Sequence, residues 1–283
     1  MLRRFQQIDV FGAGPFSGNP LAVVLDAEGL STEEMQRFTR WTNLSEATFL
    51  LPPIASEADY RVRIFTLSRE LPFAGHPTLG SCHAWLTAGG EPRRPDLIIQ
   101  ECGGGLVPVR RSGKGLAFAA PPLLRSGPVD EDFLTQVAAV LGIARPEIMD
   151  AQWADNGPGW VAVLLQDAEA VLAIEPDFRR YSGEGGLDIG LVGPYPPGSE
   201  CAFEVRALFS DEQGNMREDP ATGSLNASLA QWLLASGRAT DPYVTSQGTR
   251  LGRMSRLHIE RDRDGRIWVG GNTVSSIKGE IDI

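Results

Sequence analysis

The chain has 283 residues, of which 42% are hydrophobic and 22% charged, a globular composition with room for about two domains. Acidic residues outnumber basic ones, 36 to 26, and this balance disfavours a general binder of nucleic acids or anionic membranes. We expect neither a membrane-spanning segment nor a secretory signal, and therefore a cytoplasmic protein.

The first half of the chain is predicted to be mostly strands with two helices. Ser31 and Glu34 have the spacing of a capping box, and Met35, Phe38 and Trp41 follow at helical spacing as the expected core face of the first helix. The second helix is predicted over residues 77–88, ended by two glycines. Strands are predicted over residues 5–11, 21–25, 47–51, 60–66, 97–100, 106–110 and 116–119.

A proline-rich stretch, residues 121–128, is the expected linker between an N-terminal lobe, residues 1–120, and a C-terminal lobe, residues 129–278. After it, Asp130 can cap a helix that ends at Gly142. A further helix is predicted over residues 222–235. Strands are predicted over residues 160–165, 187–191, 203–209, 243–246, 257–260 and 267–269.

The two halves contain a matching block, which indicates an internal duplication. Residues 60–65 resemble residues 203–208, and residues 74–86 can be aligned with residues 221–233. The two helical segments of this block, 76–90 and 220–237, contain no Asp, Glu, Lys or Arg. A helix without charge is usually enclosed by protein, so we predict that each half wraps a sheet around its own central helix. Two amphipathic helices with Ser, Thr and Asn outside are the alternative.

Three cysteines and three histidines are spread along the chain without the spacing of a metal site. We therefore expect no zinc site, and cysteines that fill the core. These residues are Cys82, Cys102, Cys201, His76, His83 and His258.

The starts of both uncharged helices are rich in small residues. Free backbone N–H groups and the positive end of the helix dipole would suit a substrate carboxylate there. Well-capped helices without a ligand are the alternative. Glu46 precedes an apolar strand, where partial desolvation would raise its pKa towards that of a working acid/base. An ordinary surface glutamate is the alternative for that position.

Four segments together resemble the PhzF-like phenazine-biosynthesis family. They are Asp9-Val-Phe through Gly18-Asn-Pro-Leu-Ala-Val-Val, Asn43-Leu-Ser-Glu-Ala-Thr-Phe49, Glu70-Leu-Pro-Phe-Ala-Gly-His-Pro-Thr-Leu-Gly80 and Glu218-Asp-Pro-Ala-Thr-Gly-Ser224. The resemblance implies a diaminopimelate-epimerase-like α/β fold: two pseudo-symmetric domains, each a curled, mostly antiparallel sheet around a central helix. It also implies that residues 279–283 return to the first domain, a homodimer, and no metal or organic cofactor.

The same resemblance assigns the site residues. Glu46 matches the catalytic acid/base, His76 and Asp219 match its polar partners, and the substrate-holding positions are Gly75, Gly223 and Ser224. These matches imply an isomerase that moves a proton between carbons of a small carboxylic acid, similar to trans-2,3-dihydro-3-hydroxyanthranilate isomerase. A carboxylate-binding or regulatory protein with a vestigial site is the alternative.

Other features of the sequence limit the related activities. The related racemases use two cysteines at the helix starts, and none of the cysteines of this chain lies there. A Ser/His hydrolase is disfavoured because Ser224 lacks the G-x-S-x-G elbow. Leu67 and Leu225 depart from the family pattern and leave the substrate open.

Overall fold

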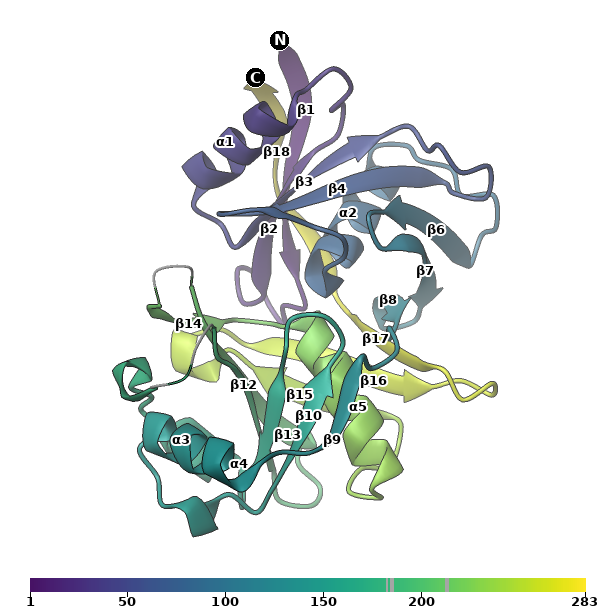
Figure 1. Cartoon of the computed structure of the whole chain (residues 1–283). Coiled ribbons are helices and arrows are strands. Elements are labelled where there is room, and N and C mark those ends of the chain that lie inside the picture. The colour runs from purple at the N-terminus through teal and green to yellow at the C-terminus, as the bar shows by residue number, and fades with distance from the viewer. Residues whose placement is uncertain (182, 184–185, 212–213) are drawn as a thin grey trace. The chain divides into compact units, whose positions relative to one another are not determined.

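The computed structural model describes residues 1–181, 183, 186–211 and 214–283, which form two compact α/β units. The first unit comprises Met1–Ala119 and Trp268–Ile283, and the second comprises Ala120–Ile267 (Figure 1). Each unit has its own set of paired strands and its own central helix.

The first unit is built from ten strands and two helices. Its strands are β1 (Leu2–Val10), β2 (Asn19–Val24), β3 (Glu46–Leu51), β4 (Tyr60–Thr66), β5 (Glu70–Leu71), β6 (Leu97–Cys102), β7 (Gly105–Ser112), β8 (Gly115–Ala119), β17 (Ile267–Gly271) and β18 (Thr273–Asp282), with Ile267 the last residue of the second unit. Its helices are α1 (Thr32–Thr42) and α2 (Gly75–Thr87). The strands pair in the order β18–β1–β2–β3–β4–β6–β7–β8–β17, and β2–β3 and β4–β6 are the parallel pairs among them.

An isolated single-residue bridge lies outside these strands: Arg94 pairs in antiparallel fashion with Leu97 at the start of β6. It closes the turn that leads from α2 into β6, because the backbone N–H of Leu97 also donates to the carbonyl of Arg94. The bridge is local and does not extend the sheet.

The second unit repeats this plan. Its strands are β9 (Arg125–Pro128), β10 (Asp150–Asp155), β11 (Val161–Leu164), β12 (Asp188–Pro194), β13 (Phe203–Ser210), β14 (Met216–Asp219), β15 (Tyr243–Gln247) and β16 (Ser255–Arg261). Its helices are α3 (Glu131–Leu141), α4 (Ala168–Ala173) and α5 (Gly223–Ala235), with 3-10 turns at Arg145–Glu147, Phe178–Arg180 and Thr249–Leu251. The strands pair in the order β9–β10–β11–β12–β13–β15–β16, and β11–β12 and β13–β15 are parallel.

The order of pairings confirms the predicted duplication. In each unit an antiparallel pair is followed by a parallel crossover through a helix, α1 or α4, and then by an antiparallel pair. A short strand, β5 or β14, and a second helical crossover through α2 or α5 complete the repeat. The matching sequence block therefore coincides with β4, β5 and α2 in one unit and with β13, β14 and α5 in the other.

The two uncharged helices are enclosed by their own units, as predicted. Nine of the 13 residues of α2 and ten of the 13 residues of α5 are buried. Close approach to the sheet depends on glycine: a Cβ on Gly80 of α2 would lie 2.5 Å from the side chain of Leu21, and one on Gly190 of β12 would clash with Leu225 of α5. Burial on every side explains why neither helix carries a charged residue.

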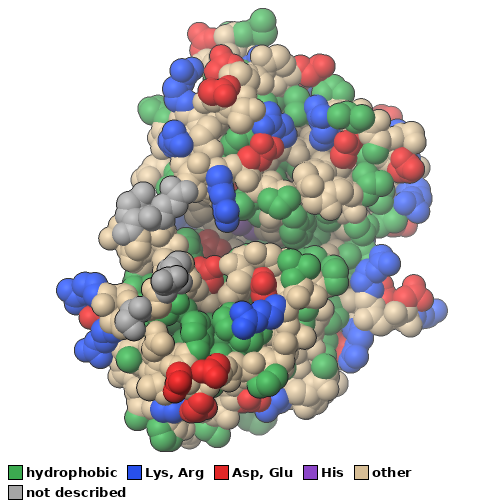
Figure 2. All heavy atoms as spheres, in the orientation of Figure 1, with side chains coloured by type: hydrophobic (Ala, Val, Ile, Leu, Met, Phe, Trp, Pro, Cys, Tyr) green, Lys and Arg blue, Asp and Glu red, His purple; other side chains and the backbone are tan. Residues whose placement is uncertain are grey.

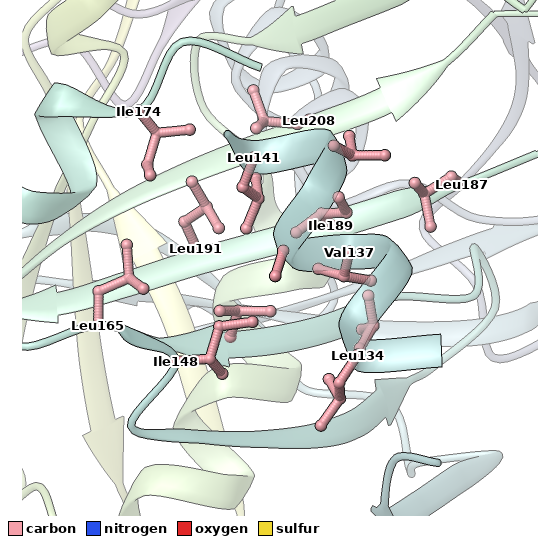
Figure 3. Packing of buried hydrophobic residues seen from close by; sticks show 14 of the residues in the cluster. Leu134, Val137, Leu141, Ile148, Leu165, Ile174, Leu187, Ile189, Leu191 and Leu208 are labelled. Atoms are coloured by element: carbon pink, nitrogen blue, oxygen red, sulfur yellow. The ribbon is translucent and has the colours of Figure 1, made fainter. Parts of the chain in front are cut away.

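The opposite face of each sheet is covered by the remaining helices. In the first unit, Met35 of α1 packs against Ala47 and Phe49 of β3. In the second unit, α3 places Leu134, Val137 and Leu141 over Ile189 and Leu191 of β12 (Figure 3). Each sheet is thus an apolar layer between a central helix and an outer helix.

The helix caps confirm the local predictions, with one exception. Ser31 and Glu34 form the capping box, and Asp130 and Gly142 bound α3. Trp41 was expected in the core but is 81% exposed. Three residues cover less than one full helical turn, so two successive steps of three turn the side chain of Trp41 away from the core face. Thr39, four residues after Met35, is buried in its place.

The boundaries between the two units differ from those predicted from the sequence. It returns to the first unit at Trp268 and not at residue 279, because β17 pairs with β8 and β18 with β1. Residues 121–128 are no free linker, since Arg125–Pro128 form β9 and pair with β10. Backbone pairing between strands thus fixes boundaries that hydrophobic patterning does not show.

The charges on the viewed face are mixed. Figure 2 shows Lys and Arg side chains dispersed among Asp and Glu, and not gathered into a basic patch. None of the helices that the structure describes is both long enough and apolar enough to cross a membrane.

A substitution at Gly193 tests the tight contact between β12 and the start of α4. A Cβ at this position would strike the backbone carbonyl of Asp167, the N-cap of α4, so the backbone must move. We expect Gly193→Ala to lower the free energy of unfolding by about 1–3 kcal/mol in urea titrations. Gly279→Ala, where no atom lies within 4 Å of the new Cβ, is the control and should change little. Equal stability of the two variants would contradict this packing.

Candidate functional site

Two of the predicted site residues meet in the first unit. Glu46 is the first residue of β3, and His76 is the second residue of α2. The Nε2 atom of His76 lies 3.4 Å from Oε2 of Glu46, and the side chains are 5% and 16% exposed. The parallel crossover between β4 and β6 carries α2 across the sheet, and its start comes beside the start of β3. The fold therefore joins residues that are 30 positions apart in the sequence.

Asn19 fixes the protonation of His76. The Nδ2 atom of Asn19, the first residue of β2, lies 3.3 Å from Nδ1 of His76. An amide nitrogen donates, so Nδ1 accepts and the proton of the neutral ring is on Nε2, facing Glu46. Burial lowers the pKa of His76 to about 3, which keeps the imidazole neutral. Glu46 thus faces a neutral N–H group.

A buried aspartate shapes the loop that leads to Asn19. The carboxylate of Asp9, at the end of β1, accepts hydrogen bonds from the backbone N–H groups of Ser17 (3.1 Å) and Gly18 (2.9 Å). A Cβ on Gly18 would lie 2.6 Å from both Asp9 Oδ1 and the backbone nitrogen of Gly12. Asp9 and the glycines therefore determine where β2 begins, and with it the position of Asn19.

The start of α2 has the expected small residues. Ala74 is its N-cap and makes no side-chain hydrogen bond to the helix, and Gly75 is its first residue. Both Gly75 and His76 are buried. This first turn offers backbone N–H groups and the positive end of the helix dipole, the features expected of a carboxylate-binding position.

The other predicted residues lie in the second unit, where α5 begins in the same way. Asp219 is the last residue of β14, and Thr222 is the N-cap of α5. The Thr222 hydroxyl donates to Oδ2 of Asp219 at 2.6 Å. Gly223 is the first residue of the helix and is buried. Ser224 follows; its hydroxyl accepts from the indole N–H of Trp160 at 3.4 Å.

Gln247, at the end of β15, holds this helix start together. Its amide nitrogen donates to the backbone oxygen of Asp219 and to the hydroxyl of Thr222, both at 2.9 Å. Its amide oxygen accepts from the backbone N–H of Thr222 at 3.0 Å and from Nδ2 of Asn226 at 2.9 Å. All four hydrogen-bonding positions of this buried amide are used, so the turn from Asp219 to α5 is rigid.

Gly248 completes the same turn. Its φ is +86°, and a Cβ there would lie 2.7 Å from the carbonyl oxygen of Pro220. A side chain is therefore excluded by both conformation and contact.

The sequence did not assign roles to Asn19, Gln247 or Asn226. All three are buried polar residues. Asn19 stands in one of the motifs that carry the family resemblance, but its contact with His76 reaches 57 positions along the chain, and the contact of Gln247 with Thr222 reaches 25. A polar residue at either end of a strand is the signal that could have found Asn19 and Gln247, and an amide within an uncharged helix is the signal that could have found Asn226.

The remaining candidate groups are placed as follows. Cys82 is buried in α2, and burial raises the pKa of its thiol to about 12. Leu225 is fully buried, against Gly190, and Leu67 is partly exposed. Within the part of the chain that the structure describes, no three His, Cys, Asp or Glu side chains gather in an arrangement that could hold a metal ion.

The neutrality of His76 can be tested by nuclear magnetic resonance. Because its pKa is about 3 in the folded protein and near 6.5 in the unfolded chain, the unfolded state binds more protons between these values. We expect the imidazole signals of His76 to stay unchanged from pH 8 to pH 5, and this residue to make the fold less stable as the pH falls below about 6.5. The urea-unfolded protein is the control and should titrate normally. A midpoint near 6.5 in the folded protein would contradict the assignment.

The comparisons with known proteins agree over the whole chain. The family model described as phenazine biosynthesis-like protein matches residues 8–279. A Schizosaccharomyces pombe protein named antisense-enhancing sequence 1 is 34% identical, over 98% of this chain and 97% of its own. A trans-2,3-dihydro-3-hydroxyanthranilate isomerase from Pseudomonas aeruginosa is also 34% identical, over 98% of this chain and 99% of its own.

A solved structure shows the same fold. The PhzF-family protein of Enterococcus faecalis is 24% identical and superposes with a TM-score of 0.78, over 100% of both chains. The chain therefore belongs to the phenazine biosynthesis-like (PhzC-PhzF) protein family.

Proposed function

We propose that this protein is a cofactor-independent isomerase that moves a proton between two carbons of a small carboxylic acid. The observation that carries the proposal is the buried contact of Glu46 with a neutral His76. The relative from Pseudomonas aeruginosa makes trans-2,3-dihydro-3-hydroxyanthranilate the first substrate to test. Other relatives of the chain are named as uncharacterised isomerases, and one of them is from Pasteurella multocida.

Glu46 is proposed to act as the single acid/base. Its carboxylate removes a proton from one carbon and, as the carboxylic acid, returns it to another carbon on the same face of the substrate. One group suffices for such a shift, whereas epimerisation requires an acid and a base on opposite faces. The helix starts carry Ala74 and Thr222 as N-caps, and the thiol of Cys82 is buried with a pKa of about 12. A racemase with two thiols is therefore disfavoured.

His76 is proposed to support Glu46 without competing for its proton. With a pKa of about 3, its imidazole is less basic than an ordinary glutamate carboxylate. The proton taken from the substrate therefore stays on Glu46 and can be returned to carbon. The Nε2–H group facing the carboxylate, which Asn19 determines, stabilises the charged form of Glu46 before the proton is taken.

The other family positions are proposed to hold the substrate. Asp219 would orient it and relay protons, and Gly75, Gly223 and Ser224 would bind it through backbone and hydroxyl groups. The two helix starts support this assignment because their first turns are rich in small residues and suited to a carboxylate. We also propose that the protein is a homodimer and works in the cytoplasm.

Replacement of Glu46 tests the proposed chemistry. Glu46→Gln keeps the shape of the side chain but cannot accept the proton, so we expect turnover of trans-2,3-dihydro-3-hydroxyanthranilate to fall about 100- to 10,000-fold. Circular dichroism and substrate affinity should be nearly unchanged. Glu91→Gln, at an exposed position, is the matched control and should keep full activity. An active Glu46→Gln variant would remove this mechanism.

Deuterium exchange separates an isomerase from a binding protein. In deuterated water an isomerase incorporates deuterium at a carbon of the substrate, because the proton on Glu46 exchanges with solvent. A carboxylate-binding or regulatory protein would bind the same compound without exchange at carbon. Affinity without exchange would therefore favour that alternative.

A further inference from the structure

We infer that Arg206 is a positioning residue, which fixes the approach to α5 through a two-pronged ion pair with Glu218. The corresponding ion pair of the first unit, Arg63 with Glu70, fixes the segment that leads into α2. The effect on turnover rests on the proposed function, whereas the effect on the backbone does not.

In the second unit the pair is buried and makes further hydrogen bonds to the backbone. Nε and Nη2 of Arg206, on β13, donate to Oε1 and Oε2 of Glu218, on β14, at 3.0 and 2.9 Å. The two side chains are 3% and 7% exposed. Nη1 of Arg206 donates to the carbonyls of Val171 (3.1 Å) and Ile174 (2.7 Å) at the end of α4. One guanidinium therefore ties together two strands and a helix.

The first unit has the same pair in a more exposed setting. Nε and Nη2 of Arg63, on β4, donate to the two carboxylate oxygens of Glu70, on β5, at 2.7 and 2.6 Å. Nη2 also donates to the hydroxyl of Thr32, the first residue of α1, at 3.0 Å. Here too the arginine joins two strands to the crossover helix of its unit.

The positions of the two pairs agree with the duplication. Glu70 pairs with Phe65 in the β4–β5 register, and Glu218 pairs with Leu208 in the β13–β14 register. In both units the arginine precedes that partner by two residues, and the central helix begins five residues after the glutamate. The ion pair and the helix start thus keep a constant spacing in both repeats.

The ion pair of the second unit lies next to the proposed site. Asp219 directly follows Glu218, and β14 has four residues, of which Met216 and Arg217 are exposed. Such a short strand has few hydrogen bonds of its own to fix its direction. The fork between Arg206 and Glu218 fixes it from one side, and Gln247 holds the backbone oxygen of Asp219 from the other. Planar, two-pronged geometry is required, which a lysine does not supply.

Hydrogen exchange and kinetics together test this role. Glu218→Gln should speed amide exchange in residues 219–224, and Glu70→Gln should speed it in residues 71–78. Each should lower kcat about 10- to 100-fold with KM changed less than about threefold, because a small displacement of a catalytic group is costly. Asp150→Asn, which breaks the ion pair with Arg238 elsewhere in the second unit, is the control and should change neither readout.

Two further variants separate positioning from stability. Removing one member of a buried pair can unfold a protein, whereas replacing both members by apolar residues is often neutral. The double variant Arg206→Met, Glu218→Met should therefore fold, yet show the faster exchange and the reduced kcat. Arg206→Lys keeps the positive charge but not the two-pronged geometry, so its kcat should also stay below that of the wild type.

The outcomes are distinguishable. Wild-type exchange at residues 219–224 in the folded variants would overturn the inference, and so would a kcat in the double variant equal to that of the wild type. If the wild-type protein itself turns over no substrate, the proposed function fails and the exchange measurement alone decides the positioning role.

Discussion

In each unit a curled layer of strands encloses a helix that carries no charged residue. A helix buried on all sides cannot satisfy its polar side chains with water, so each must find a partner in the surrounding strands. In α2, the Thr78 hydroxyl accepts from Gln100 of β6, and the Ser81 hydroxyl donates to Thr48 of β3. These bonds fix the helix against the sheet.

In α5 a buried polar side chain also bonds to a neighbouring strand, but the amide and the hydroxyl have changed places. Asn226 occupies a first-turn position like that of Thr78, and its amide oxygen accepts from the hydroxyl of Thr245 on β15. Where the first unit uses a hydroxyl on the helix and an amide on the strand, the second uses an amide on the helix and a hydroxyl on the strand. Rigid helix starts are therefore a product of burial, and groups placed at those starts are held in position before any substrate binds.

Local signals in the sequence were sufficient for most elements and for part of the site. The capping box at Ser31 and the glycine at position 142 need no tertiary information, and β4 was predicted with its observed bounds, Tyr60–Thr66. β18 was missed because its side chains are polar and largely exposed, so that its pairing with β1 leaves no apolar alternation. The contact of His76 with Asn19 depends on two crossovers of the chain, which no local pattern specifies.

The duplication also shows how one backbone came to carry different chemistry in its two copies. In the β3–β4 register Glu46 faces Thr66, and in the β12–β13 register Asp188 faces Phe209. These are corresponding positions, so each repeat begins this strand with a carboxylate. The first residues of α2 and α5, Gly75 and Gly223, shift the alignment of residues 74–86 with residues 221–233 by one position. With the helix starts aligned, the copies diverge after the ion pair: Leu71 stands where the second unit has Asp219, and His76 where it has Ser224.

This divergence explains why the two ion pairs differ in burial. Beside an apolar Leu71, the pair of Arg63 and Glu70 has solvent on one side. Beside Asp219, the pair of Arg206 and Glu218 is desolvated, and the carboxylate of Asp219 follows it directly in the chain. Burying this ion pair costs desolvation free energy, which a pair of apolar side chains in the same place would not cost. The need to hold Asp219 in one orientation gives a physical reason for keeping the ion pair.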